Sequence, residues 1–445
     1  MNNYKKSELF RKEVHRLIPG GCHTYSKGDD TFPSISPAAI SHGKGAYVWD
    51  IDNNKFLDCT MGLTSVTIGH AADKINNAVI QEINKGVNFQ RPSYIELEYA
   101  KEFVKLIPQH DRIKFAKNGS TVTTASVKLA RAYTGRKLIA FPNDHPFYSY
   151  DDWFIGTTKC SFGIPPEISN LSVGFKSCNI ESLKQLFQKY PNQIAGVIME
   201  PKRSYCDVNC SCKITNQNYL KAATDIVHDN GSVLIMDEMI TGFKAYFPGV
   251  TSHYKIDADI STWGKSISNG FSFAAMTGKS KIMDLGSIKE SGKRKFFMSS
   301  TTHGGETIGI RAALETLNFY KKNDVIGHNH LVGEQLFKEC NLILKNLDFH
   351  REIKIEQNYW MLVFSFNHKN KKLIPNVQTL FSQEMIKNGV LIQNSFVPCF
   401  SHKKKEIDFF LNAFKKTINF LKRVYSNESE LKKISPVKKV FREYV

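Results

Sequence analysis

The middle of the chain alternates short apolar runs with stretches of helical periodicity. Apolar runs that do not alternate with polar residues are typical of parallel strands buried on both faces. Helical patterns lie between them, over residues 123–134 and 218–229. The repeated order of strand, helix and strand predicts an α/β fold with a doubly wound, mostly parallel sheet. The runs are residues 233–236, 195–199, 138–141 and, less purely, 112–116.

The two ends of the chain read differently from its middle. Residues 46–49 predict a strand before a turn at 52–54, and helices and strands of higher charge follow from about residue 325. We expect an N-terminal segment 1–60 that contributes to a small α+β domain, a large domain 61–324, and a C-terminal small-domain part 325–445 with a basic tail. Residues 405–424 predict a helix with a core-facing stripe of Ile407, Phe410, Leu411, Phe414, Ile418 and Leu421.

Composition narrows the classes of protein to consider. No run of 18 apolar residues occurs and the N-terminus is polar, so we expect a cytoplasmic protein without a membrane span. The net charge of +18 is spread along the chain without a nucleic-acid-binding motif, which favours a solvated basic surface over binding of anionic substrates or polyanions. Three close cysteines, Cys206, Cys210 and Cys212, lack paired Cys-x-x-Cys spacing, so a surface loop is favoured over a metal site.

Two charged residues stand at positions where a cofactor is commonly held. Asp237 ends a buried run, where it is either a helix cap or structural ion-pair partner, or the acceptor for a protonated pyridine nitrogen. Lys265 follows Gly264 and precedes small serines, so it is either a surface lysine or an amine held close to a cofactor. Burial would lower the pKa of such an amine and suit it to imine chemistry.

A third motif lies between a predicted strand and a predicted helix. Residues 116–121 read Ala-Lys-Asn-Gly-Ser-Thr. A Gly-Ser turn that opens a helix offers unpaired backbone N–H groups and the positive end of the helix dipole. The motif is therefore either an ordinary N-cap or a phosphate cradle.

These motifs, in their order, resemble the class III pyridoxal-phosphate aminotransferases, and most of all the glutamate-1-semialdehyde aminomutase branch. The match extends from residue 15 to about 425. Its signs are Ile-Pro-Gly-Gly at 18–21, Gly-Ala-Tyr-Val-Trp-Asp at 45–50, Gly-His at 69–70, Lys-Leu-Ala-Arg-Ala-Tyr-Thr-Gly at 128–135, Glu-Pro at 200–201, Asp-Glu at 237–238 with Thr-Gly-Phe at 241–243, Gly-Lys at 264–265, and Ser-Thr-Thr-His-Gly-Gly-Glu at 300–306.

The resemblance implies a fold type I enzyme with pyridoxal 5'-phosphate as its cofactor, and it implies a role for several residues. Lys265 is the Schiff-base lysine and Asp237 the partner of the pyridine nitrogen. Gly119 and Ser120 bind the phosphate, with Asn118 at the family's usual serine position. Phe147 stacks on the cofactor ring, in a segment that replaces the family's Tyr-His-Gly. Thr301 reaches the phosphate of a neighbouring subunit, which implies a homodimer with a shared active site.

The sequence departs from the family at the substrate side. Lys27 stands where the aminomutase has a carboxylate-binding arginine, and lysine cannot make a bidentate fork. Val397 takes the place of an acidic residue, and Asp-Asp-Trp-Phe-Ile at 151–155 replaces a gating loop of small residues. We take Lys27 and Trp49 as substrate-binding candidates.

These departures from the family decide which function we expect first and which functions we keep as alternatives. We expect an aminotransferase that uses glutamate as donor and a keto or aldehyde acceptor from sugar or specialised metabolism. The aminomutase reaction is the alternative within the family. A non-catalytic basic binding protein is the alternative of another class, and the presence of both Lys265 and Asp237 argues against it.

Overall fold

The computed structural model describes residues 4–201, 216–289, 291–292 and 294–444, which form two compact units. Unit 1 takes in the residues up to Ala72 and Asp324–Arg442, and unit 2 takes in Asp73–Asn323 and the residues after Arg442. The sequence places the first boundary at residue 60, whereas residues 61–72 group with unit 1 because they bond to it. Gly45 and His70 exchange backbone hydrogen bonds of 2.9 and 2.8 Å. Cys206, Cys210 and Cys212 lie outside the described residues.

Unit 2 is built on a seven-stranded sheet of order β4-β10-β9-β8-β7-β5-β6. Neighbouring strands from β9 to β6 pair in parallel, and β10 runs antiparallel to both of its neighbours. The doubly wound, mostly parallel sheet is therefore confirmed, and the four predicted runs are four of its strands. The strands are β4 (Arg112–Ala116), β5 (Leu138–Pro142), β6 (Ser172–Phe175), β7 (Ile194–Met199), β8 (Val233–Asp237), β9 (Ile260–Trp263) and β10 (Ala274–Gly278).

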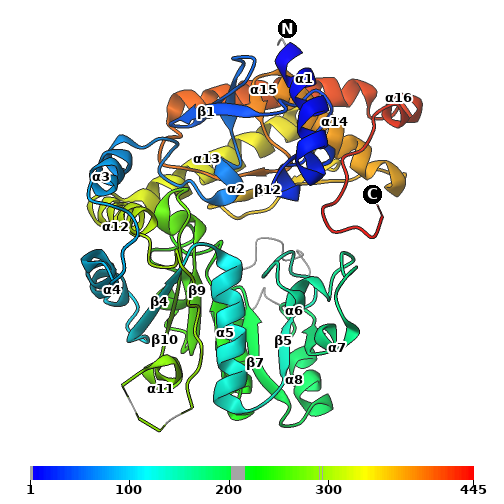
Figure 1. Cartoon of the computed structure of the whole chain (residues 1–445). Helices are drawn as coiled ribbons and strands as arrows, with labels where there is room; N and C mark the ends of the chain where they lie inside the picture. Colours follow the sequence, from blue (N-terminus) through cyan, green and yellow to red (C-terminus); the bar gives the residue numbers. More distant parts are fainter. Residues whose placement is uncertain (1–3, 202–215, 290, 293, 445) are drawn as a thin grey trace. The chain divides into compact units, whose positions relative to one another are not determined.

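One long helix of unit 2, α5 (Gly119–Thr134), packs against the central strands of this sheet (Figure 1). It begins four residues before the predicted start, because the side chain of Asn118 accepts a hydrogen bond from the Thr121 amide and caps the first turn. The other helices of unit 2 are α3 (Asp73–Ile83), α4 (Tyr94–Val104), α6 (Asp152–Ile155), α7 (Pro166–Ser169), α8 (Ile180–Lys189), α9 (Asn216–Asp229), α10 (Val250–His253), α11 (Ser280–Met283) and α12 (Thr307–Lys322).

Unit 1 combines strands from both ends of the chain. In its four-stranded sheet, of order β1-β2-β3-β13, the late strand β13 pairs in parallel with the early strand β3. The strands are β1 (Ile40–Lys44), β2 (Tyr47–Asp50), β3 (Lys55–Asp58) and β13 (Val390–Leu391), and a second sheet contains β11 (Ile353–Ile355), β12 (Leu362–Phe366) and β14 (Ser395–Phe396). The helices are α1 (Lys5–Leu17), α2 (Met61–Thr64), α13 (Val325–Asn346), α14 (Ile374–Lys387), α15 (Lys404–Val424) and α16 (Glu428–Lys432). Across the described part of the chain, no helix has the length and apolar character that crossing a membrane requires.

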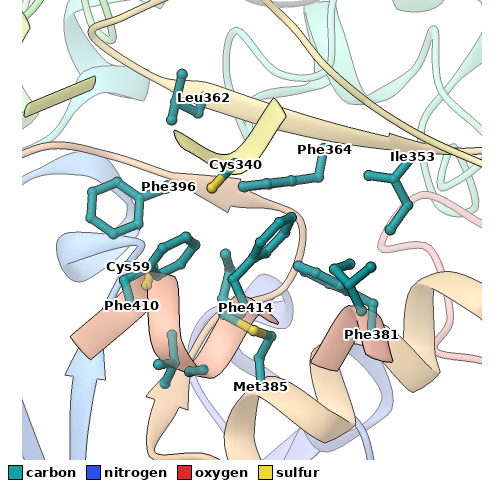
Figure 2. Packing of buried hydrophobic residues seen from close by; sticks show 14 of the residues in the cluster. Cys59, Cys340, Ile353, Leu362, Phe364, Phe381, Met385, Phe396, Phe410 and Phe414 are labelled. Atoms are coloured by element: carbon teal, nitrogen blue, oxygen red, sulfur yellow. The ribbon is translucent and has the colours of Figure 1, made fainter. Parts of the chain in front are cut away.

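Phenylalanine rings pack against one another within the largely aliphatic core of unit 1 (Figure 2). Phe364 lies 5.5 Å from Phe381 and 5.8 Å from Phe414 between ring centroids. Five residues of the stripe predicted on α15 are buried, and Leu411 is partly buried and packs against the same core. The predicted core-facing helix is therefore confirmed.

Candidate functional site

Five polar side chains follow strands or begin a helix at one edge of the unit 2 sheet. Asp237 ends β8, Glu200 follows β7, His145 follows β5, Lys265 follows β9, and Asn118 stands between β4 and α5. The register pairs Met199 of β7 with Met236 of β8, so Glu200 and Asp237 come next to each other along that edge. The carboxyl ends of strands in an open α/β sheet are where such folds bind ligands.

Asp237 is a buried carboxylate with one oxygen already occupied. Its Oδ1 accepts hydrogen bonds from the Met239 amide at 2.9 Å and from Thr262 Oγ1 at 3.0 Å. Among the residues that the structure describes, no group donates a hydrogen bond to Oδ2. Burial raises the pKa of Asp237, and the bond from Met239 opposes the rise. The side chain can therefore offer one free carboxylate oxygen to a cationic N–H group.

Lys265 lies in a backbone conformation that lysine seldom adopts. Its φ is 49°, in the left-handed region, at the start of the short helix η5 (Lys265–Ser268). A Cβ on the preceding Gly264 would lie 2.2 Å from Met239 Sδ, so a larger residue there would displace the Met239 side chain. Burial lowers the pKa of Lys265, while the charges of Asp237 and Glu200 raise it. A lowered pKa increases the fraction of neutral, nucleophilic amine.

The N-terminus of α5 has the features of an anion site. Sixteen residues of helix begin at Gly119, and their first N–H groups have no partner within the helix. A Cβ on Gly119 would lie 3.0 Å from Met239 Sδ, so the Met239 side chain packs closely against this turn. Ser120 is buried, and its Oγ accepts a hydrogen bond from the Tyr150 amide at 3.0 Å, which leaves its hydroxyl proton free to donate.

Two further candidates of unit 2 are exposed. Phe147 is 46% exposed, and its ring contacts Phe154 edge to face at 5.9 Å. Thr301 is exposed in the turn that precedes α12. The Phe147 ring and the Thr301 hydroxyl therefore lie at the surface of unit 2.

The substrate candidates belong to the other unit. Lys27 is exposed at the end of η2 (Tyr25–Lys27), and Trp49 of β2 stacks on His42 at 4.8 Å. Val397 is fully buried and contributes no charge. Unit 2 thus contains the seven candidates for the cofactor, and unit 1 contains Lys27 and Trp49.

The segment after Phe147 is fastened to α5. Trp153 is buried, and its Nε1 donates to Thr124 Oγ1 at 2.8 Å. Thr124 Oγ1 in turn donates to Asp151 Oδ2, which also accepts from Ser149 Oγ at 3.1 Å. The residues that replace the expected gating loop are therefore held in one place by a hydrogen-bond network.

Three side chains near the candidate residues escape a reading of the sequence. Met239 fills the space beside Gly119 and Gly264, and only its position directly after Asp-Glu could have drawn attention to it. Lys244 is buried, and its Nζ donates to Ser266 Oγ at 2.6 Å. Burial lowers the pKa of Lys244 well below its usual range.

His145 is the third of these side chains. Its Nε2 lies 3.2 Å from Glu200 Oε2, and both side chains are almost completely buried. A histidine between two prolines after a strand is a weak signal that could have been noticed. The contact itself joins residues 55 positions apart, which no local pattern reveals.

Taken together, the sheet edge of unit 2 combines three chemical capacities. Lys265 offers a nucleophilic amine, Asp237 offers an anionic acceptor, and the start of α5 offers N–H groups to an anion. A phosphorylated, aldehyde-bearing aromatic base would use all three.

Comparisons with known proteins agree with this geometry. A model of the family "Aminotransferase class-III" matches residues 31–418. Glutamate-1-semialdehyde 2,1-aminomutase 1 of Listeria welshimeri is 28% identical, over 95% of this chain and 100% of its own length. The 3-aminobutyryl-CoA aminotransferase of Cloacimonas acidaminovorans is 25% identical, over 93% and 96%. Among solved structures, the PLP-bound FumI protein of Sphingopyxis sp. MTA144 superposes with a TM-score of 0.86 at 21% identity, covering 97% of this chain and 98% of that one.

Proposed function

The chain belongs to the aminotransferase class-III family, and from that premise we propose that it transfers an amino group from glutamate to a keto or aldehyde acceptor. Enzymes of this family depend on pyridoxal phosphate, so the chain is a pyridoxal-phosphate-dependent enzyme. A keto sugar or an intermediate of specialised metabolism is the acceptor that we propose.

The described residues fit that cofactor. A Cβ on Gly119 or Gly264 would meet Met239, and Oδ2 of Asp237 is open to a donor. In our proposal Gly119, Ser120 and the Asn118 cap bind the phosphate, Asp237 pairs with the ring nitrogen, and Lys265 supplies the amine that binds the aldehyde carbon. When bound, pyridoxal phosphate acts as an electron sink that lets an amino acid lose its α-proton.

The chain's own residues have three tasks in this proposal. Lys265 would hold the cofactor through its amine and would act as the base that moves the α-proton. Asp237 keeps the proton on the ring nitrogen, because a buried carboxylate stabilises the cation beside it. Phe147 would stack on the ring, and Met239, which lies beside Gly119 and Gly264, would add an apolar contact at the site.

The observation that favours the aminotransferase over the aminomutase is the hydrogen-bond network at Thr124. An aminomutase must keep its intermediate enclosed while the amino group moves between adjacent carbons, which calls for a mobile gate. In this chain the corresponding segment is tied to α5 through Asp151 and Trp153. Lys27, where the aminomutase has an arginine, also gives a weaker hold on a substrate carboxylate.

We also propose that the enzyme is a cytoplasmic homodimer that completes its phosphate site with Thr301 of the second protomer. Large apolar side chains are exposed on and around α3 and α4, and such a surface is typical of an interface. They are Ile80, Ile83, Phe89, Tyr94 and Leu97. The exposed position of Thr301 supports its reaching another protomer.

Two parallel assays test the reaction. The enzyme is supplied with glutamate semialdehyde alone, and separately with labelled glutamate and a panel of keto sugars and aldehydes. We expect label transfer to an acceptor and little 5-aminolevulinate. Efficient 5-aminolevulinate formation, with no transfer from glutamate to any acceptor, would show that the enzyme is an aminomutase and not an aminotransferase. The aminomutase among the relatives is the reason for testing this alternative.

A variant tests the role of the segment itself. Thr124→Val removes the hydroxyl that joins Asp151 and Trp153, so the segment gains mobility. We expect more proteolytic cleavage near residues 151–155 and a larger share of 5-aminolevulinate than in the unaltered enzyme. Thr316→Val is the matched control, because the Thr316 hydroxyl donates to the Ala312 carbonyl within its own helix α12.

A further inference from the structure

We infer that His145 is a positioning residue that joins Glu200 to the backbone of Phe147 and so holds the segment that carries the Phe147 ring in place. The inference rests on the proposed function, in which Phe147 stacks on the cofactor. It assigns a role to a histidine that stands two residues before the stacking ring.

The hydrogen bonds of His145 define its protonated nitrogen. The Phe147 amide donates to Nδ1 at 3.2 Å, so Nδ1 is the acceptor. Nε2 then carries the proton and donates to Glu200 Oε2, also at 3.2 Å. One imidazole therefore bridges a buried carboxylate after β7 and a main-chain amide after β5.

Two neighbours fix the plane of this imidazole. The ring of Tyr148 stacks on it with centroids 3.8 Å apart and an angle of 16°. Pro146 follows His145 directly and restricts the backbone of the residue before it. The backbone of His145 is also tied to the end of β5, since its amide donates to the Pro142 carbonyl at 3.1 Å. These contacts fix the imidazole of His145, so its hydrogen bond with the Phe147 amide can in turn fix the backbone at Phe147.

Glu200 needs such a partner for two reasons. A buried carboxylate without a hydrogen bond is costly. Glu200 is also the neighbour of Asp237 along the sheet edge, and its charge adds to the burial that raises the pKa of Asp237. The hydrogen bond that His145 donates holds the Glu200 carboxylate in place and reduces the electrostatic effect of that carboxylate on Asp237.

Two conservative variants separate the two halves of the bridge. The amide nitrogen of glutamine lies where Nε2 does, so His145→Gln keeps the donor to Glu200 and loses the acceptor for Phe147. The amide oxygen of asparagine lies where Nδ1 does, so His145→Asn keeps the acceptor and loses the donor. His145→Phe keeps the ring against Tyr148 and loses both.

Each variant is measured by its dissociation constant for pyridoxal phosphate, by the circular dichroism of the bound cofactor, and by urea unfolding without cofactor. We expect His145→Gln to weaken cofactor binding about two- to tenfold, the loss of one hydrogen bond, and to reduce the dichroism. We expect His145→Asn to lower the urea midpoint of the apoprotein, and to weaken cofactor binding by less than His145→Gln does, because the Phe147 amide keeps its acceptor while Glu200 loses its donor. His145→Phe should show both effects.

A double-mutant cycle decides between positioning and general stabilisation. If His145 acts through Phe147, His145→Gln should have no further effect on cofactor binding in a Phe147→Leu background. The same loss in both backgrounds would overturn the inference, and so would a folded His145→Phe protein with normal binding and dichroism. A Phe147→Leu protein that binds the cofactor normally would instead contradict the proposed stacking. In that case the urea midpoints of the His145 variants would still test the hydrogen bond between His145 and Glu200.

Discussion

The two units differ in how their candidate residues are held. In unit 2, the carboxylate of Asp237 is fixed by two hydrogen bonds, and Lys265 lies at a φ of 49° beside a glycine on which a Cβ would meet Met239. In unit 1, Lys27 is an exposed side chain at the end of one helical turn. Cofactor chemistry needs fixed atoms, whereas recognition of different substrates is adjusted at exposed positions. The cofactor can therefore be inferred from such a chain more readily than the substrate.

The strongest test of this difference is the removal of the amine in unit 2. Lys265→Ala should lower kcat by about a thousandfold or more, because both the covalent attachment and the proton transfer depend on it. Borohydride reduction followed by peptide mapping should place the cofactor on Lys265 in the unaltered enzyme. A label on the buried Lys244, or on any other lysine, would contradict the assignment.

Buried histidines allow the two units to be compared by their response to acid. Burial lowers the pKa of His110 in unit 2 and of His402 in unit 1 from 6.5 to about 4. The unfolded chain therefore binds more protons than the folded one between these values, so stability falls as the pH drops from about 6.5 to about 4. Each histidine should contribute about 3 kcal/mol to that loss.

Urea unfolding of the apoprotein across this pH range measures the effect. His110→Phe and His402→Phe should each make the free energy of unfolding less dependent on pH. His350→Phe, at an exposed position, is the control. Equal pH dependence in all three variants would show that neither buried histidine is responsible.

A smaller effect is expected at Thr301. Thr301→Ala should weaken cofactor binding by about 1.5–3 kcal/mol, the strength of a hydrogen bond to a charged group, and leave the fold of the protomer intact. Equilibrium dialysis and sedimentation together measure cofactor binding and the state of assembly. A stable monomer that holds the cofactor normally would contradict the shared site.

The smallest effect is expected in unit 1. Lys27→Arg restores a fork that can bind a carboxylate at two points, and we expect it to change KM for a carboxylate substrate by less than about tenfold, with kcat unchanged. Lys12→Arg, on α1, is the matched control. A large change in kcat on Lys27→Arg would mean that this residue takes part in more than binding.

The sequence was most informative where one segment determines its own structure. The unbroken apolar runs of β5, β7 and β8 are buried throughout, so their pattern predicted them. The strand β6 is only partly buried and escaped notice. The contacts of His145 with Glu200, and of Met239 with Gly119 and Gly264, depend on which strands the fold brings together, and no local pattern contains that information.

The parallel pairing of β3 with β13 has a consequence for synthesis on the ribosome. The strand Lys55–Asp58 is translated early, and its partner Val390–Leu391 emerges more than 300 residues later. Unit 2 is contiguous between these points, so it can collapse while translation continues. The N-terminal segment must wait for nearly the whole polypeptide before its sheet is complete. A truncated or stalled chain would therefore carry a formed unit 2 beside an unfinished unit 1, which is a form that chaperones and proteases recognise.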